Sequence, residues 1–257
     1  MGLSVHDPFV DPLGNPLGLA KVLGLLSINP TIVDLTGGFE SSIDVVGDYV
    51  IPSGFSFFRV TVVGAGGAGT SIYSATGGGL ARSAILPVKK GLVISYVAAT
   101  YTVTAASTPA SVGRTSSARF LDTVLQATGG QAGGPGMLGG VGSGGVDNFN
   151  GGTVGANTSG TGAAGTNGNG ANSPASVGSP GLAGTGDAGG SGASVSSGLQ
   201  AGGGGWMGRG GSAANPRGGA PDDLYSRDAI GGQGGGWGGG GGKSNYGGFG
   251  GVRIELW

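Results

Sequence analysis

The sequence of 257 residues contains no cysteine and only one histidine, His6. Without thiols the chain has no disulfide and no thiolate metal site. One histidine in a proline-rich stretch supplies neither a Ser-His-Asp triad nor a histidine-based metal centre. We therefore expect a protein that is not an enzyme and that needs no cofactor or metal.

Charged side chains are also scarce. They make up 10% of the residues, and 12 Lys and Arg stand against 13 Asp and Glu, for a net charge of −1. A nucleic-acid-binding protein needs a basic stripe to neutralise phosphates, and the sequence has none, so we expect no nucleic-acid partner. The hydrophobic content of 37% argues against a generally disordered chain.

Long hydrophobic runs are missing as well. The longest, LGLAKVLGLLSI over residues 17–28, is too short and too interrupted to span a bilayer. The start of the chain has His6 and Asp7 where a secretion signal would carry lysine or arginine. We expect neither a signal peptide nor insertion into a membrane.

Glycine is what the sequence has in excess, with 66 residues unevenly distributed. Seventeen of them precede residue 129, which leaves 49 for the rest of the chain. This shift in composition, together with a proline-rich start, divides the sequence into residues 1–38, 39–128 and 129–257.

Residues 1–38 combine prolines, which favour extended structure, with the apolar run at 17–28, which could form a short helix. This run either packs on its own domain or docks onto a partner such as a fibre end, because exposed apolar patches often mark interaction sites. We favour docking and assign these residues as an attachment segment. Its contact residues would be Leu19, Val22, Leu23, Leu25 and Leu26.

Residues 39–128 contain runs rich in Val, Ile, Thr, Tyr and Phe, separated by glycine and proline. Examples are FSFFRVTVV, LVISYVA and SSARF, with a turn at the KKG of residues 89–91. Such runs are typical of β-strands, and helical periodicity is weak. We predict a small sheet or sandwich. The closing GVRIELW of residues 251–257 alternates in the same way and predicts a terminal strand that returns the chain to this body.

Within residues 129–251, glycine repeats every three residues in several short runs whose phase slips between them. The longest run comprises Gly130, Gly133, Gly136, Gly139, Gly142 and Gly145. Three residues per turn is the period of the left-handed extended helix, which has no internal hydrogen bonds and must pair its backbone with neighbours. A disordered low-complexity tail is the alternative, and the broken phase excludes collagen. The fold class we predict is mostly β with little helix: a small β-sheet body, packed polyglycine-II helices and a C-terminal strand.

Several segments in this order resemble the glycine-rich domain of bacteriophage tail-fibre and tail-tip proteins: DYVIPSGFSFFRVTVVGAGGAG, LPVKKGLVISYVA, GRTSSARF, LQATGGQAGG and GGFGGVRIELW. One departure is LVISYVAATYTVTA, which lacks the glycine pair that follows the hairpin strand in that family. The glycine-rich half is similar in character to the distal adhesins of T-even-like phages, in which stacked polyglycine-II helices carry receptor-binding loops.

This resemblance implies a virion protein at a tail tip or fibre tip. It would attach to other tail or fibre proteins through residues 1–38 and bind a protein or glycan receptor on the bacterial outer surface. The alternative is a purely structural virion or fibre-cap protein that makes no contact with a receptor.

Two glycine motifs suggest nucleotide binding but lack the required context. Residues 64–69 spell G-x-G-x-x-G, yet no acidic residue stands about 20 residues further on, where Lys89 and Lys90 occur. Gly242-Lys243-Ser244 resembles the end of a phosphate-binding loop, but Trp237 occupies the position of its first glycine. We expect no nucleotide site.

The candidate receptor-binding residues interrupt the glycine background with bulky or charged side chains. Loops on a rigid scaffold often carry binding residues, and aromatic and arginine side chains often dominate the binding energy. Phe249, beside the final strand, is expected instead in the core. For the first two groups of candidates a core role is equally open, and Asp222-Asp223 favours a solvated turn over paired catalytic carboxylates. The candidates are Asn148 and Phe149; Trp206, Met207 and Arg209; and Asp222, Asp223, Leu224, Tyr225 and Arg227.

Overall fold

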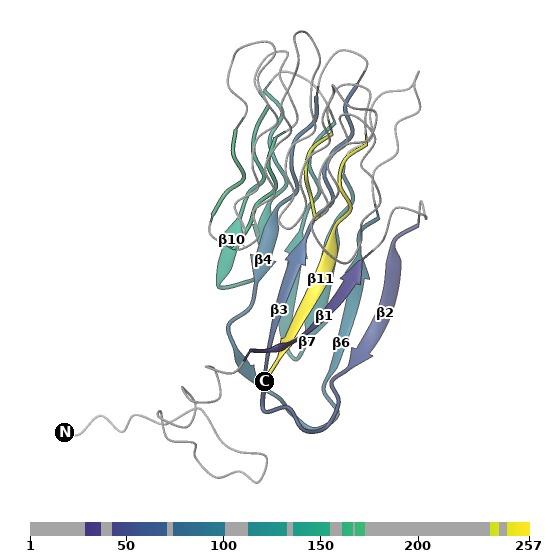
Figure 1. The fold of residues 1–257 in the computed structure, drawn as a ribbon, viewed down its shortest axis with the longest axis vertical. Coiled ribbons are helices and arrows are strands. Elements are labelled where there is room, and N and C mark those ends of the chain that lie inside the picture. The colour runs from purple at the N-terminus through teal and green to yellow at the C-terminus, as the bar shows by residue number, and fades with distance from the viewer. Residues whose placement is uncertain are drawn as a thin grey trace, which may run out of the picture.

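The computed structural model describes residues 29–36, 43–70, 74–100, 113–132, 136–154, 161–166, 168–172, 237–241 and 246–257. Within these ranges the chain forms eleven β-strands and no helix (Figure 1). The mostly β fold predicted from the sequence is therefore confirmed.

The strands form two antiparallel sheets. The first has the order β1-β11-β3-β4-β10, with β5 also paired to β3, and the second has the order β2-β6-β7-β8-β9. The strands of the first sheet are β1 (Thr31–Thr36), β3 (Phe57–Val63), β4 (Leu80–Arg82), β5 (Leu86–Pro87), β10 (Asp147–Phe149) and β11 (Gly251–Leu256). The strands of the second are β2 (Val45–Val50), β6 (Val93–Ala98), β7 (Ser116–Phe120), β8 (Thr123–Ala127) and β9 (Gly142–Ser143).

Alternation along the strands places one apolar face of each sheet against the other. In β3 this face carries Phe58, Val60 and Val62, which are fully buried. Phe58 meets Phe120 of the second sheet edge to face, with ring centroids 5.4 Å apart. This contact is the favourable geometry for two aromatic rings. The result is a β-sandwich, one of the two architectures expected from residues 39–128.

Strand β11 shows that the chain does return to the β-body at its C-terminal end. It lies between β1 and β3, and its register with β3 runs from Gly251 opposite Val63 to Leu256 opposite Phe58. Val252, Ile254 and Leu256 are buried in the same core as Phe58. The terminal strand predicted from GVRIELW is therefore confirmed, and it occupies an internal position in its sheet.

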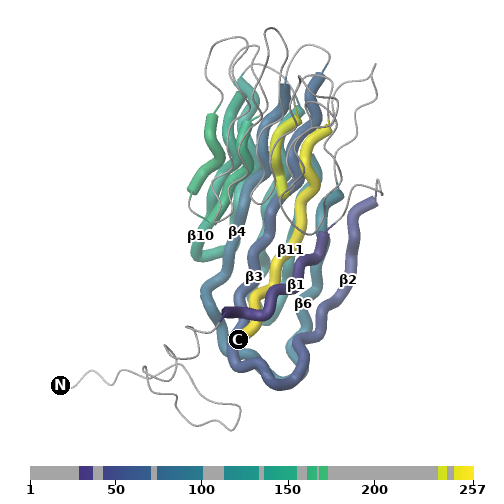
Figure 2. Tube along the Cα trace, in the orientation of Figure 1, coloured from purple at the N-terminus to yellow at the C-terminus, as the bar shows by residue number. Residues whose placement is uncertain are grey.

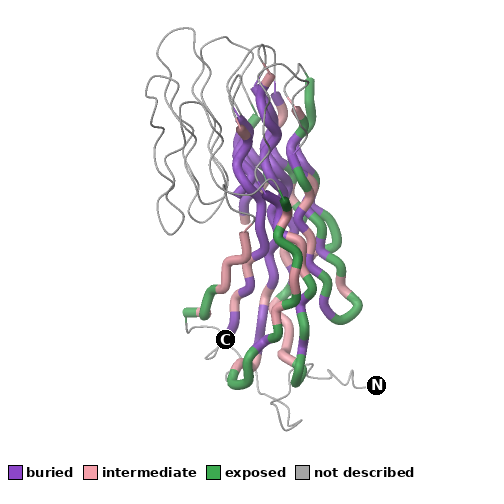
Figure 3. The backbone as a smooth tube through the Cα atoms, turned by 90° about the vertical axis from the view of Figure 1, so that its right-hand side faces the viewer, coloured by how far each residue is buried: buried purple, intermediate pink, exposed green. Residues whose placement is uncertain are grey.

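Beyond the sandwich, extended glycine-rich segments continue from the strand ends and lie side by side (Figures 1 and 2). We call them the glycine bundle. Most of their residues are buried (Figure 3). The segments are residues 64–70, 74–79, 113–115, 128–132, 136–141, 150–154, 161–165, 169–172, 237–241 and 246–250.

Backbone hydrogen bonds in the bundle repeat every three residues. The N–H groups of Gly64 and Gly67 both donate to segment 74–79, at Gly79 (3.0 Å) and Thr76 (2.9 Å). The two residues between them donate elsewhere, to Arg114 and Gly248. In a sheet, by contrast, the backbone groups pair with only the two neighbouring strands.

Segment 74–79 shows the same repeat at the centre of the bundle. Ala75 and Gly78 donate to segment 237–241, whereas Thr76 and Gly79 donate to segment 128–132. Its carbonyl groups accept from segment 64–70 and from two further segments. The bundle is thus linked by backbone hydrogen bonds in several directions around each segment.

The structure corrects two details of the expected three-residue register. Gly136 and Gly144 have φ values of +71° and +82° and lie at turns, so the register from Gly130 to Gly145 is not one continuous helix. Gly142 belongs to β9, which pairs with β8 as an ordinary antiparallel strand. Turns and strand pairing require glycine here for different reasons, although the spacing is the same.

The regional boundaries also change. Strand β1 falls inside the segment of residues 1–38 but pairs with β11 over its whole length, from Thr31 opposite Leu256 to Thr36 opposite Gly251. Segments 64–70 and 74–79, from the predicted β-body, belong to the glycine bundle. The change in glycine content at residue 129 therefore does not mark a structural boundary, because residues on both sides of it contribute to both sheets and to the bundle.

Strand β1 makes a truncation test informative. Val33 and Leu35 pack against the core, and Asp34 pairs with Arg253 at 2.7 Å. Compared with deletion of residues 1–28, deletion of residues 1–38 should lower the free energy of unfolding by a further ~3 kcal/mol or more, since it removes apolar burial and leaves Arg253 without its carboxylate. Urea unfolding of both truncated proteins measures this difference. Equal stability of the two would contradict a structural role for β1.

Candidate functional site

The two ends of the molecule differ in what they carry. At the sandwich end lie the start of β1, the C-terminal residue next to it, and the turns between strands (Figure 1). These turns contain Ser53-Gly54, Lys90-Gly91 and Leu121-Asp122. The glycine bundle occupies the opposite end (Figure 1).

At the bundle end, residues near the ends of the described segments are hydrogen-bonded to one another. Thr161 donates to the carbonyl group of Ala75, and Ala75 donates to that of Gly241. Gly136 donates to Val154. Each of these residues lies within a few positions of a chain stretch outside the described residues. The ends of several bundle segments therefore gather on the side away from the sandwich.

At many glycines inside the bundle there is no room for a side chain. A Cβ atom added to Gly66, Gly78 or Gly130 would overlap the backbone carbonyl of Gly239, Gly64 or Thr76 respectively. Such overlap with backbone cannot be relieved by rotating a side chain. At these glycines the bundle presents backbone only, and many of the other side chains buried in its segments are small, such as those of Ala65, Ala75 and Ala163.

Two threonine side chains take part in the bonding of the bundle, because their hydroxyl groups form hydrogen bonds with backbone groups of neighbouring segments. Thr161 Oγ1 accepts from Gly77 N at 2.9 Å and donates to Gly152 O at 2.7 Å. Thr76 Oγ1 donates to Leu138 O at 3.0 Å and accepts from the N–H group of Gln131. Both hydroxyls are fully used within the fold.

The charges on the outer face of the first sheet are also used within the fold. Arg59 pairs with Glu255 at 2.6 Å, Arg253 with Asp34 at 2.7 Å and Arg82 with Asp147 at 2.7 Å. Each pair joins residues directly opposite one another on neighbouring strands. In the described ranges no group of three or more histidine or acidic side chains could hold a metal ion.

Two of the candidate receptor residues, Asn148 and Phe149, lie in β10. Asn148 Oδ1 accepts from Gly145 N at 3.0 Å, and its Nδ2 donates to Gly145 O at 2.7 Å, so the side chain closes the turn between β9 and β10. Phe149 is half-buried and packs against a cluster that includes Leu80. The structure thus gives both residues a structural role in the sandwich rather than a place at the far end of the bundle.

The other candidates lie outside the described residues. They are the receptor candidates Trp206, Met207, Arg209, Asp222, Asp223, Leu224, Tyr225 and Arg227, and the attachment candidates Leu19, Val22, Leu23, Leu25 and Leu26. Among the residues that the structure does describe, it does not assemble the predicted receptor site.

Two aromatic residues lie at the junction between sandwich and bundle. Trp237 and Phe249 are buried with their ring centroids 6.3 Å apart, and the Arg253 guanidinium lies 5.9 Å from the Trp237 ring. They form a cluster with Val63, Leu80 and Ala164. The core position expected for Phe249 is confirmed. The signal for Trp237 was a bulky side chain in a glycine run shortly before a predicted strand.

Compared with protein-family models and with curated proteins, the chain gives no match. The described residues include no helix with the length and hydrophobicity needed to cross a membrane. The class of protein that the fold defines is an antiparallel β-sandwich extended at one end by a glycine bundle.

Proposed function

We propose that this protein is a phage tail-tip or tail-fibre adhesin, which presents the far end of its glycine bundle to a receptor on the bacterial surface. The observation that carries the proposal is the polarity of the molecule. The ends of several bundle segments gather opposite the end where β1 begins and β11 finishes. A protein held at one end and exposed at the other needs this arrangement.

We also propose that the bundle segments are polyglycine-II helices. A helix with three residues per turn directs every third N–H group to the same side. The shared neighbour of Gly64 and Gly67, and that of Ala75 and Gly78, support this geometry. Because such a helix has no internal hydrogen bonds, its neighbours must satisfy its backbone, which accounts for the close packing at glycine.

This architecture suits receptor recognition. The scaffold depends on backbone contacts, so side chains in the connections between segments can vary without disturbing it. Binding residues are commonly found on loops held by a rigid scaffold. Residues 1–28 precede β1 and would attach the protein to the tail or fibre at the sandwich end, which leaves the bundle end free to meet the cell.

Binding of the fluorescently labelled full-length protein to a panel of bacterial strains, measured by flow cytometry, tests the proposal. We expect saturable binding to the host strain. Trp206→Ala, Tyr225→Ala or Arg227→Ala should weaken it by about 30-fold for a residue worth roughly 2 kcal/mol in the interface. The melting temperature of these variants should stay unchanged, and Lys89→Ala, at the sandwich end, serves as the control.

Two results would contradict the assignment. If the three variants bind like the parent while Lys89→Ala abolishes binding, the receptor site lies at the sandwich end. If the protein binds no strain, and antibodies against it do not block infection by the phage that carries it, the structural fibre-cap function replaces the adhesin.

A further inference from the structure

The outer face of the second sheet carries several exposed valines. Val46, Val50, Val93 and Val124 point away from the core on β2, β6 and β8, with 71%, 57%, 41% and 54% of their surfaces exposed. Val97 lies opposite Val46 on β6 and is half-buried. Exposed apolar side chains that gather on one face commonly mark an interaction site.

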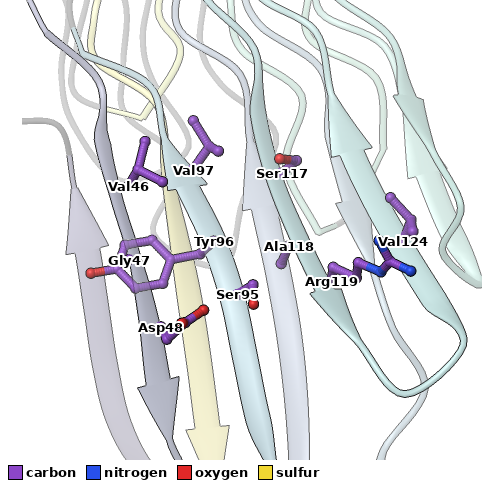
Figure 4. Close-up of a pocket in the computed structure, with 10 residues that line it drawn as sticks. All are labelled: Val46, Gly47, Asp48, Ser95, Tyr96, Val97, Ser117, Ala118, Arg119 and Val124. Atoms are coloured by element: carbon purple, nitrogen blue, oxygen red, sulfur yellow. The ribbon is translucent and has the colours of Figure 1, made fainter.

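The same face is hollowed at its centre. A depression of about 270 Å³ is lined by residues of β2, β6, β7 and β8, among them the small Ser95 and Ser117 and the larger Val46, Asp48 and Arg119 (Figure 4). The small residues on β6 and β7 leave a hollow. The exposed valine on β2, Val46, has a side chain of a size that could fill such a hollow in another molecule.

Asp48 and Arg119 are the charged groups of this depression. Asp48 lies opposite Ser95, and Ser95 lies opposite Arg119, so the three form one row across β2, β6 and β7. Within the described ranges neither charged side chain forms an ion pair. In this part of the chain Arg119 is the only arginine without a carboxylate partner, since all the others have one: Arg59, Arg82, Arg114 and Arg253.

We propose that this face is an interface between two copies of the chain, related by a two-fold axis that runs parallel to the strands and passes over Ser95 of β6. Rotation about this axis places β2 of each copy over β7 of the other. Asp48 of each copy then meets Arg119 of the other, so that the interface holds two compensated charge pairs. A two-fold axis across the strands would instead bring Asp48 against Asp48, which like-charge repulsion disfavours.

The apolar side chains fit the same symmetry. Val46 of one copy lies over the hollow at Ser117 of the other, because the two occupy the same row on either side of Val97. Val93 and Val97, on the axis, meet their own equivalents. Aligned packing of two sheets about 10 Å apart brings such side chains into contact. An isologous interface of this kind closes as a dimer.

The axis direction also determines how the two copies point. Because it runs along the strands, both glycine bundles extend to the same side and both β1 starts lie on the other. A dimer of this kind could therefore be held at one end and present two bundles at the other. The dimer itself rests on the charges and valines of the sheet and is independent of the adhesin function.

Sedimentation velocity of the full-length protein over a wide concentration range tests the interface. We expect a dimer. Asp48→Arg and Arg119→Asp should each weaken self-association by at least about tenfold, because each places like charges in contact across the axis. An equimolar mixture of the two variants should form a heterodimer, since an arginine of the first variant then meets an aspartate of the second in both contacts. Lys89→Asp changes the charge by the same amount outside the interface and should leave the dimer intact.

Circular dichroism melting of each variant establishes that it is folded before association is measured. A parent protein that stays monomeric at all concentrations overturns the proposal. So does an oligomer that survives both charge reversals, or a pair of variants that fails to associate on mixing. If a variant does not fold, Asp48→Asn and Arg119→Gln replace the reversals, and unchanged association of both would equally overturn the interface.

Discussion

Replacing Gly78 by alanine is expected to lower the free energy of unfolding by at least ~3 kcal/mol, because the added methyl group overlaps backbone. The Cβ atom would overlap the carbonyl oxygen of Gly64 and would lie 3.1 Å from that of Ala65. Gly78 also donates to Gly238, and its own carbonyl group accepts from Ala164. Segment 74–79 therefore cannot move away from one neighbour without breaking its hydrogen bonds to others.

Gly136 provides the matched control, since an added Cβ atom would meet no other atom within 4 Å but the residue has a φ of +71°. Gly136→Ala should cost about 1 kcal/mol from backbone strain alone, and Gly136→Asn less, because asparagine tolerates this conformation. Urea unfolding monitored by circular dichroism measures all three. A cost for Gly78→Ala no larger than that for Gly136→Ala would show that the bundle is not closely packed at its centre.

Trp237→Ala is expected to lower the free energy of unfolding by about 3–5 kcal/mol, the usual cost of emptying a large buried aromatic site. The indole is 3% exposed and covers Gly251, where an added Cβ atom would lie 2.7 Å from the ring. It also contacts Phe249 and lies against the Arg253 guanidinium. Its removal should loosen the junction between sandwich and bundle.

Hydrogen exchange distinguishes this effect from a general loss of stability. The N–H groups of Gly78 and Gly248, which bond inside the bundle, should lose more protection than that of Val60, which bonds to Ser83 Oγ in the sandwich. Trp237→Phe keeps a ring in the site and should retain much of the stability. A Trp237→Ala protein within about 1 kcal/mol of the parent would contradict a joining role, because such a cost is typical of an ordinary point substitution.

The alternation of apolar residues in the sequence predicted most strands of the sandwich. In β3 and β11 every second side chain enters the core, and glycine precedes both runs, so local pattern and tertiary environment agree. Strand β1 was missed because TIVDLT follows an apolar run that was assigned to attachment. Its position depends on pairing with β11, more than 200 residues away along the chain, which local patterning does not report.

Of the candidate receptor residues, the structure describes only Asn148 and Phe149. Asn148 and Phe149 interrupt the glycine background, as a binding loop would, but the turn at Gly145 and the cluster around Leu80 account for them. Asp48 and Arg119 carry no sequence signal, since only strand register brings them into one row.

Composition and local pattern were enough to establish the absence of thiol chemistry, the β character of the body and the need of its glycine-rich segments for backbone partners. Which partners these are depends on the three-dimensional arrangement of the chain. Gly64 and Gly67 reach segment 74–79, whereas the neighbouring Gly66 reaches Gly248. Each of these glycines is required by the carbonyl group of a distant segment, while Gly136 is required by a turn, and the same three-residue spacing is compatible with both. The physical reason is that backbone pairing between extended segments depends on how they pack in space. Glycine has no side chain, so the sequence does not indicate which neighbour each glycine contacts.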